Sequence, residues 1–361
     1  MFIRVLFILM ILTALPACSP PTTYGEPPAE SEVLSALPPE DPAPRQIGVP
    51  VIVREPGFTD PLTGLPAREP AVDCRPVAVA IDNHHQALPQ SGISQAAICY
   101  EILAEGNITR IIAIFHDFNT QKIGPIRSVR SYFLNFAMDY DAIFVHHGGS
   151  PQGYDLIEES GIAALDAMRL SGTFWRDPER AGIPGMSVHS SYTGEALIRQ
   201  AQERFKFRPV IREGLNPGFS FYDEPAQPDG AAGAAYVYVP FAAGYGSMFE
   251  YREDGLYYKY MEDEPQIDAE TGEQLSVSNI LIQYAPVYLI QGDTAGRREA
   301  VLTGAGDGVL ITRGGWAPVR WGKQSLKTPT RWYNTDGGAL YFNRGKTWIC
   351  VVSPETAVKI E

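Results

Sequence analysis

The sequence predicts two folded modules, a mixed α/β module in residues 60–215 and a smaller, mostly-β module in residues 216–361. Two patterns lead to this prediction. In the first region, short β-branched runs alternate with segments of helical periodicity, which is typical of strands and helices layered in one domain. In the second region, β-prone runs follow one another between Gly, Asp and Asn residues, without a helical pattern. The roughly 300 residues involved are enough for two domains.

The first 17 residues have the composition of a bacterial secretion signal. Arg4 precedes an apolar run at residues 5–12, which is shorter than the roughly 20 residues that span a bilayer. The run leads into Leu15-Pro16-Ala17-Cys18, which resembles the lipobox of bacterial lipoproteins. The resemblance implies cleavage before Cys18, a diacylglyceryl thioether on its sulfur and an acylated amino group, with chains such as palmitate. We therefore expect lipid anchoring at the extracytoplasmic face of a bacterial membrane, with an ordinary signal peptide as the alternative.

Residues 18–59 predict a disordered, Pro-rich tether. The stretch is rich in Pro, Glu, Ser and Ala and has few large apolar side chains. Such a segment cannot bury enough surface to offset its conformational entropy. We expect a semi-extended spacer that holds the folded modules away from the membrane.

In the first module, strands and helices are expected in alternation. Apolar and β-branched runs predict strands at residues 77–81, 98–103, 109–115 and 142–145. Helical spacing predicts helices at residues 128–140, 151–160 and 193–205. Ser150 is the expected N-cap of the second helix, with Pro151 as its first residue, and Thr193 is the expected cap of the third. This order predicts a mixed sheet.

In the second module, only strands are expected, arranged as a small barrel or a sandwich. The predicted strands are residues 235–239, 255–260, 279–290, 308–312, 317–321, 338–342 and 347–352. Four of the five tryptophans fall in this module: Trp316, Trp321, Trp332 and Trp348. We expect them to fill its core; an exposed strip that stacks on sugar rings is the alternative.

The cysteines leave the disulfide pattern open. Besides Cys18 there are Cys74, Cys99 and Cys350, so at least one thiol stays reduced. Cys99 lies in an apolar run and is expected to be buried. A disulfide between Cys74 and Cys350 is permitted outside the cytoplasm, but the sequence does not decide it. No cysteine spacing is typical of a zinc site.

A series of short motifs follows one order along the chain: residues 75–83 (RPVAVAIDN), 89–92 (PQSG), 100–101 (YE), 109–110 (TR), 123–130 (IGPIRSVR), 146–151 (HHGGSP) and 345–349 (GKTWI). As a set, they resemble the YerB-type family of bacterial lipoproteins. The resemblance extends over residues 61–352. It implies an envelope lipoprotein with two modules, both described as domains of unknown function, and it implies no catalytic residues.

All six histidines lie in the first module, several of them where strands are expected to end. Strand ends form the ligand crevice of open α/β sheets. The motif His146-His147-Gly148-Gly149-Ser150 links a predicted strand to a predicted helix, whose N-terminus attracts anions. Arginine side chains suit carboxylate or phosphate. The candidate ligand-binding residues are therefore Asp82, Asn83, Arg110, Arg127, Arg130, His146, His147, Gly148, Gly149, Ser150 and His189.

Three other interpretations of these residues remain open. In the first, the glycines only make a tight turn, and the arginines pair with Asp82, Glu101 or Asp139. In the second, histidines and a carboxylate bind a metal ion, although no metal motif is present and we expect neither metal nor cofactor. In the third, Ser150 is a nucleophile with a histidine as base, although the Gly-x-Ser-x-Gly elbow is absent. The metal set would come from Asp82, His84, His85, His146, His147 and His189.

Two functions are consistent with the sequence. The first is a lipoprotein that binds an anionic envelope ligand, or a cell-wall or envelope protein partner, at the outer face of the membrane. The second is an envelope hydrolase that acts on a cell-wall polymer or its precursor, with His147 or His189 as general base. The formal net charge of -13 argues against nucleic acid as a partner, because phosphate binding needs a basic surface.

Overall fold

The computed structural model describes residues 58–68 and 74–361. The predicted signal, Cys18 and all but the end of the tether lie outside the described residues. No helix within the described ranges is long and apolar enough to cross a membrane.

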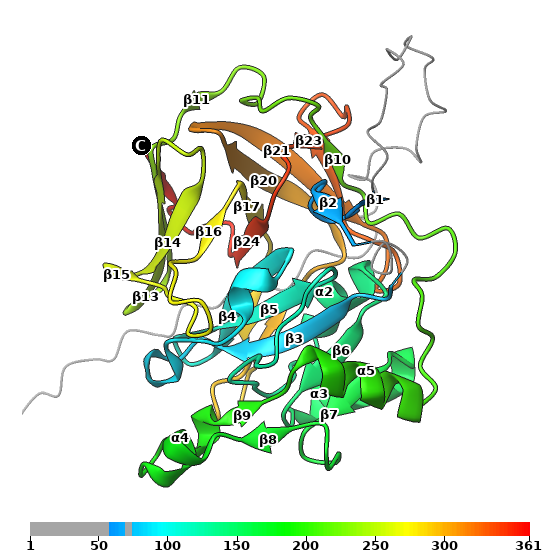
Figure 1. The fold of residues 1–361 in the computed structure, drawn as a ribbon. Helices are drawn as coiled ribbons and strands as arrows, with labels where there is room; N and C mark the ends of the chain where they lie inside the picture. The colour runs from blue at the N-terminus through cyan, green and yellow to red at the C-terminus, as the bar shows by residue number, and fades with distance from the viewer. Residues whose placement is uncertain (1–57, 69–73) are drawn as a thin grey trace, which may run out of the picture.

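One mixed sheet of eleven strands runs through both predicted modules (Figure 1). Its strand order is β11-β21-β20-β17-β24-β4-β5-β3-β6-β7, with β22 paired to β21. The strands of the first module are β3 (Val77–Asp82), β4 (Ile98–Glu105), β5 (Ile108–Phe115), β6 (Ile143–His146) and β7 (Ala164–Asp166). Because β3 is antiparallel to β5 and parallel to β6, the expected mixed sheet is confirmed.

The remaining strands of this sheet come from the second module: β11 (Ala232–Gly233), β17 (Asn279–Tyr284), β20 (Gly304–Thr312), β21 (Gly315–Lys323), β22 (Arg331–Asn334) and β24 (Thr347–Val352). Strand β24 joins the two modules, since it pairs in parallel with β17 on one side and β4 on the other. Cys350 lies opposite Glu101 in this register. Strand β24 of the second module therefore extends the sheet of the first module.

A second, six-stranded sheet covers one face of the long sheet. It contains β12 (Tyr236–Ala242), β13 (Tyr245–Tyr251), β14 (Tyr257–Met261), β15 (Glu264–Pro265), β16 (Ser276–Val277) and β25 (Lys359–Ile360). Val237 and Phe249 of this sheet share a core cluster with Ile280, Ile311 and Trp348 of the long sheet. The second module thus has sandwich-like layers, as expected. It does not close on itself, because one layer continues into the first module.

The tryptophans of the second module belong mainly to the core. Trp321, Trp332 and Trp348 are buried, and Trp316 packs, partly buried, against the same core. No disulfide forms within the described ranges: Cys350 and Cys74 are not joined, and Cys99 is a buried thiol.

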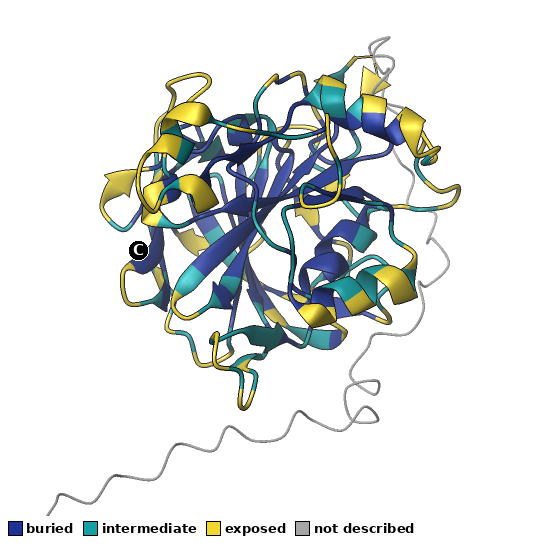
Figure 2. Ribbon diagram, turned by 90° about the horizontal axis from the view of Figure 1, so that it is seen from below, coloured by how far each residue is buried: buried dark blue, intermediate teal, exposed yellow. Residues whose placement is uncertain are grey.

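Helices cover both faces of the first-module strands. They are α2 (Phe133–Asp139), α3 (Pro151–Ser160), α4 (Pro178–Gly182) and α5 (Glu195–Arg204). Phe133 and Phe136 of α2 pack with Ile112 on one face, and Ile198 of α5 packs with Val79 on the other. Figure 2 shows the strands buried at the centre, with the exposed residues on loops and outer helices.

Of the three predicted helices, one is confirmed and two begin later than expected. Helix α3 begins at Pro151, and Ser150 accepts from the backbone N–H of Gly153 at 3.1 Å as its N-cap. Helix α2 begins at Phe133 rather than at residue 128. Residues 127 and 129 instead donate their backbone N–H groups to neighbouring segments. Thr193 is not a cap, because its hydroxyl donates to the carbonyl of Thr173 and Gly194 precedes α5.

Short elements complete the fold. They are β1 (Phe58–Thr59), β2 (Pro66–Ala67), η2 (His85–Ala87), η3 (Ile93–Gln95), β8 (Trp175–Arg176), η4 (Ser187–His189), β9 (Ser191–Tyr192), β10 (Ser220–Phe221), β18 (Val287–Leu289), β19 (Arg298–Ala300) and β23 (Tyr341–Phe342). The predicted strand at residues 279–290 is therefore interrupted between β17 and β18.

Candidate functional site

Asp82 is the centre of a buried ionic network at the end of β3. The register of β3 and β5 places Arg110 directly opposite Asp82, and their side chains pair at 3.5 Å. Asp82 also accepts from Nδ1 of His189 at 2.6 Å and pairs with Nε of Arg127 at 3.2 Å. Burial alone would raise the pKa of Asp82, but the bond from His189 and the two guanidinium charges outweigh it and lower the pKa.

A second carboxylate, Glu105, holds the other side of Arg110. Its Oε1 accepts from Arg110 at 2.5 Å, and its Oε2 accepts from Arg130 at 2.7 and 3.1 Å. Of the three partners proposed for the arginines, only Asp82 is observed in that role. Glu101 pairs with Lys259 and Asp139 pairs with Lys323, while Glu105 was not foreseen.

Arg127 links this network to the molecular surface. The network contains three arginines and two carboxylates, so one positive charge is in excess, without counting His189. The Arg110 side chain is 1% exposed and that of Arg127 is 27% exposed. Arg127 also donates to the carbonyl of Val188 at 3.2 Å. Arg127 is therefore the arginine that presents the positive charge of the network to solvent.

Next to Arg127 lies a cleft of about 340 Å³. Its polar lining comes from Arg127, Ser128, His147 and Arg176, and its other lining residues are Ile126, Gly148, Gly149, Tyr154, Met168 and Val188. Arg176 was not foreseen; it lies on the short strand β8, which no sequence pattern marked.

His147 is fixed in one tautomer at the wall of this cleft. Its Nε2 lies 3.0 Å from NH2 of Arg176, and its Nδ1 lies 2.7 Å from the hydroxyl of Ser191. Because a guanidinium group can only donate, Nε2 is the acceptor and Nδ1 carries the proton. Burial and then the charge of Arg176 lower the pKa of His147, so the imidazole is neutral at pH 7.

The glycine turn after β6 is built around the chain's own carboxylate, Asp166. Asp166 accepts from the backbone N–H groups of Gly148 and Met168, both at 2.9 Å, and from the hydroxyl of Tyr154 at 2.8 Å. Gly148 has a left-handed φ of +68°, and a Cβ at Gly149 would collide with Cγ1 of Val129. The left-handed backbone thus accounts for Gly148 and tight packing accounts for Gly149. The Asp166 carboxylate already accepts from the backbone N–H of Gly148.

The other candidate residues have structural partners. His146 is buried, with Nδ1 2.9 Å from the carbonyl of Gly148. Asn83 is buried and donates to Glu101 and Thr109. Ser150 is buried as the cap of α3, so its hydroxyl is not placed as a nucleophile. The structure therefore brings Arg127 and His147 together at the cleft, and it directs Arg110 and Arg130 to Glu105.

The histidines do not form a metal cage. His84 stacks on His189, with ring centroids 5.0 Å apart, while His146 and His147 belong to the turn after β6. Across residues 58–68 and 74–361, no group of three or more His, Cys, Asp or Glu side chains is arranged to hold a metal ion.

Comparison with known proteins gives a consistent result. Residues 62–208 match the N-terminal domain, and residues 237–349 the C-terminal domain, of the "Protein of unknown function (DUF3048)" family. The chain is 34% identical to "Putative lipoprotein YerB" of Bacillus subtilis (strain 168) over 307 aligned residues. The alignment covers 83% of this chain and 88% of that protein. The crystal structure of that protein superposes with a TM-score of 0.70, covering 84% of this chain and 99% of the other.

Proposed function

We propose, from the premise that this chain belongs to the DUF3048 family, that it is a membrane-anchored binding protein of the bacterial cell envelope. Its anchor is the lipid that the lipobox predicts on Cys18. Its ligand presents an anionic group, phosphate or carboxylate, to the cleft beside Arg127. Such groups occur on peptidoglycan stem peptides, teichoic acids and lipid headgroups.

The observation that supports this function is the convergence of Arg127, Arg176 and His147 on one cleft. None of the lining residues is acidic, although the whole chain has a formal net charge of -13. Two guanidinium groups in a cleft without a carboxylate attract anions and repel cations.

Both arginines are held in place before any ligand arrives. Arg127 is fixed by Asp82 and by the carbonyl of Val188. Arg176 is fixed by the carbonyl of Ser187 and by Nε2 of His147. Each guanidinium has five N–H donors, and these contacts use only some of them. A ligand would therefore meet ordered donors, which reduces the entropy lost on binding.

The hydrolase alternative has weaker support. A neutral His147 at a cleft is suited to general-base work, but its Nε2 is occupied by Arg176 and its Nδ1 carries a proton directed at Ser191. His189 is buried and bonded to Asp82. Catalysis would need Arg176 to leave His147 before a substrate could be deprotonated.

Binding of soluble anions to the full-length lipoprotein in detergent tests this proposal. We expect inorganic pyrophosphate or a D-alanyl-D-alanine stem peptide to bind, and Arg176→Gln to weaken that binding about tenfold or more, because a hydrogen bond to a charged group is lost.

Arg169→Gln is the matched control, because Arg169 is exposed next to the cleft, pairs with Asp166 and does not line the cleft. Its affinity for the anion should stay within about threefold of wild type, since Arg169 lies outside the cleft lining and its exposed charge is screened by solvent. Equal losses in both variants, or no binding of either anion to wild type, would contradict the proposal.

A further inference from the structure

A second basic pocket, of about 400 Å³, lies at the other end of β3 and β6. Arg75 and Asp141 line it and lie two residues before the starts of β3 and β6. Asp82 ends β3, and His147 follows β6. A six-residue strand is roughly 20 Å long, so this pocket is separate from the cleft beside Arg127. Lys327 contributes from the loop between β21 and β22 of the second module.

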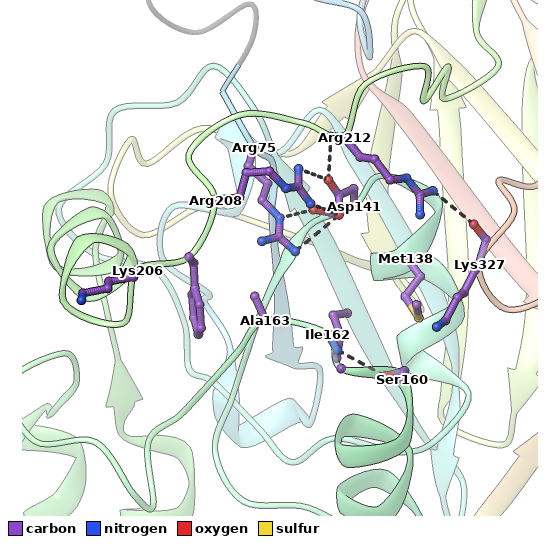
Figure 3. Close-up of a pocket in the computed structure, with 12 residues that line it drawn as sticks. Arg75, Met138, Asp141, Ser160, Ile162, Ala163, Lys206, Arg208, Arg212 and Lys327 are labelled. Atoms are coloured by element: carbon purple, nitrogen blue, oxygen red, sulfur yellow. Dashed lines mark hydrogen bonds and ion pairs between the residues drawn. The ribbon is translucent and has the colours of Figure 1, made fainter.

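Asp141 is surrounded by donors in this pocket (Figure 3). Arg208 bonds to both of its carboxylate oxygens, at 2.6 and 3.0 Å. Arg75 pairs with it at 3.4 Å, and the backbone N–H of Arg212 donates to it at 2.8 Å. Arg75 is 7% exposed, so one cation of the pocket is already desolvated. Because Asp141 already pairs with Arg75 and Arg208, it does not neutralise any other cation of the pocket.

Two more cations in this pocket have no acidic partner in the described parts of the chain. The guanidinium of Arg212 donates to the carbonyl of Lys327 at 3.3 Å. The Lys327 ammonium pairs with no carboxylate among residues 58–68 and 74–361. In Figure 3 the Lys327 side chain extends toward Met138, while Lys206 points away from the three arginines. Counting Arg75, Arg208, Arg212 and Lys327 against Asp141, the pocket has an excess of three positive charges.

Helix ends explain only part of this charge. Helices α2, α3 and α5 end next to the pocket, at Asp139, Ser160 and Arg204, and helix C-termini attract cations. That effect is weak and is confined to the last turn. Arg212 and Lys327 belong to loops outside these helices, so they are the cations that helix ends do not explain.

We propose that this pocket is a second anion site, which takes a group of at least two negative charges: a phosphomonoester or a pyrophosphate. A carboxylate would balance one of the three excess charges, whereas a dianionic phosphate balances two and presents several acceptors to fork-shaped donors. Because Lys327 belongs to the second module and the other cations to the first, the ligand is held by both. This proposal does not depend on the cleft beside Arg127.

Calorimetric titration of the full-length lipoprotein in detergent with inorganic pyrophosphate tests this site. All measurements use the Arg176→Gln background, in which the cleft has lost a cation. We expect Arg212→Gln with Lys327→Gln to lower the remaining affinity at least tenfold. The matched control is Arg320→Gln with Lys359→Gln, which removes the same charge from exposed pairs elsewhere; its affinity stays within twofold. Thermal unfolding midpoints confirm that all variants fold.

The inference is overturned if the Arg176→Gln chain binds no pyrophosphate, or if the pocket and control variants lose affinity equally. Neither result depends on whether wild type uses its cleft, so the two proposals can fail separately. Competition then distinguishes the source of the phosphate. Displacement by dihexanoyl phosphatidic acid identifies a lipid phosphomonoester, and displacement by glycerol 3-phosphate alone identifies a soluble one; both outcomes support the site.

Discussion

Lys259 and Glu101 form a buried ion pair that joins the two sheets, with Nζ 3.4 Å from Oε2 and side chains 0% and 2% exposed. Both are also hydrogen-bonded: Ser247 lies between them, accepting from Lys259 and donating to Glu101, and Trp348 donates to the same carboxylate. Lys259 belongs to β14 of the second module and Glu101 to β4 of the first. The two modules are therefore joined by charge as well as by the shared sheet.

Removing one partner of this pair should strongly destabilise the whole chain. Lys259→Met leaves Glu101 buried without its counter-charge, and we expect a loss of about 3–5 kcal/mol in the free energy of unfolding. Urea denaturation measures it. Arg320→Gln, which breaks an exposed pair with Asp307, should change stability by less than about 0.5 kcal/mol. Equal effects would show that the buried pair does not hold the modules together.

Gly149→Ala should destabilise the turn after β6. The added Cβ collides with Cγ1 of Val129, and overpacking of this kind costs about 1–3 kcal/mol. Gly182→Ala is the control, because nothing lies within 4 Å of a Cβ at that position; we expect a change within about 0.5 kcal/mol. Thermal unfolding compares the two. A stable Gly149→Ala variant would mean that the glycine is retained for a reason other than packing.

The parts of the fold that depend on local chemistry could be predicted from the sequence. Helix α3 begins where Ser150 and Pro151 indicate, because capping is decided within a few residues. The pairing of β24 with β4 could not be predicted, since it joins residues about 250 positions apart. Residues 128–132 have helical spacing but stay outside α2, because Val129 instead exchanges backbone bonds with the turn after β6.

For the candidate site too, the sequence predicted residues with a local signal but not those brought in by long-range contacts. The rule that ligands gather at strand ends located Asp82 and His147, and the affinity of arginine for anions added Arg127. These three residues lie at or next to the cleft. Glu105, Asp166 and Arg176 were missed, because their roles depend on which segments meet in three dimensions. Asp166 was detectable in principle, since it ends a strand just as Asp82 does.

The stability of the chain should fall between pH 7 and pH 5. Burial lowers the pKa values of His84, His146 and His147 below the ordinary 6.5. Below pH 6.5 the unfolded chain therefore binds more protons than the folded chain, and stability is lost until the folded pKa values are reached. The contribution of Asp82, whose pKa is lowered from 3.8, is lost only at more acidic pH.

His146→Asn should make this pH dependence shallower, because His146 is the most buried of the three histidines. Urea unfolding at several pH values between 5 and 7 measures the slope for the variant and for wild type. An unchanged slope would exclude His146 as a contributor.

Cys18→Ser should release the chain from the membrane. The substitution removes the acyl chains that the lipobox predicts, and no helix of the described residues can replace them as a membrane span. Detergent phase partitioning and incorporation of labelled palmitate measure the anchor. A variant that still partitions fully with membranes would contradict lipid anchoring at this residue.

A crystal soaked in tungstate tests most directly whether the cleft beside Arg127 binds an anion. Tungstate resembles phosphate in shape and charge, and its anomalous signal locates it without ambiguity. We expect a peak in the cleft, within hydrogen-bond distance of Arg127 and Arg176. Anomalous peaks only at other surface cations, with the cleft open to solvent and empty, would contradict anion binding in this cleft.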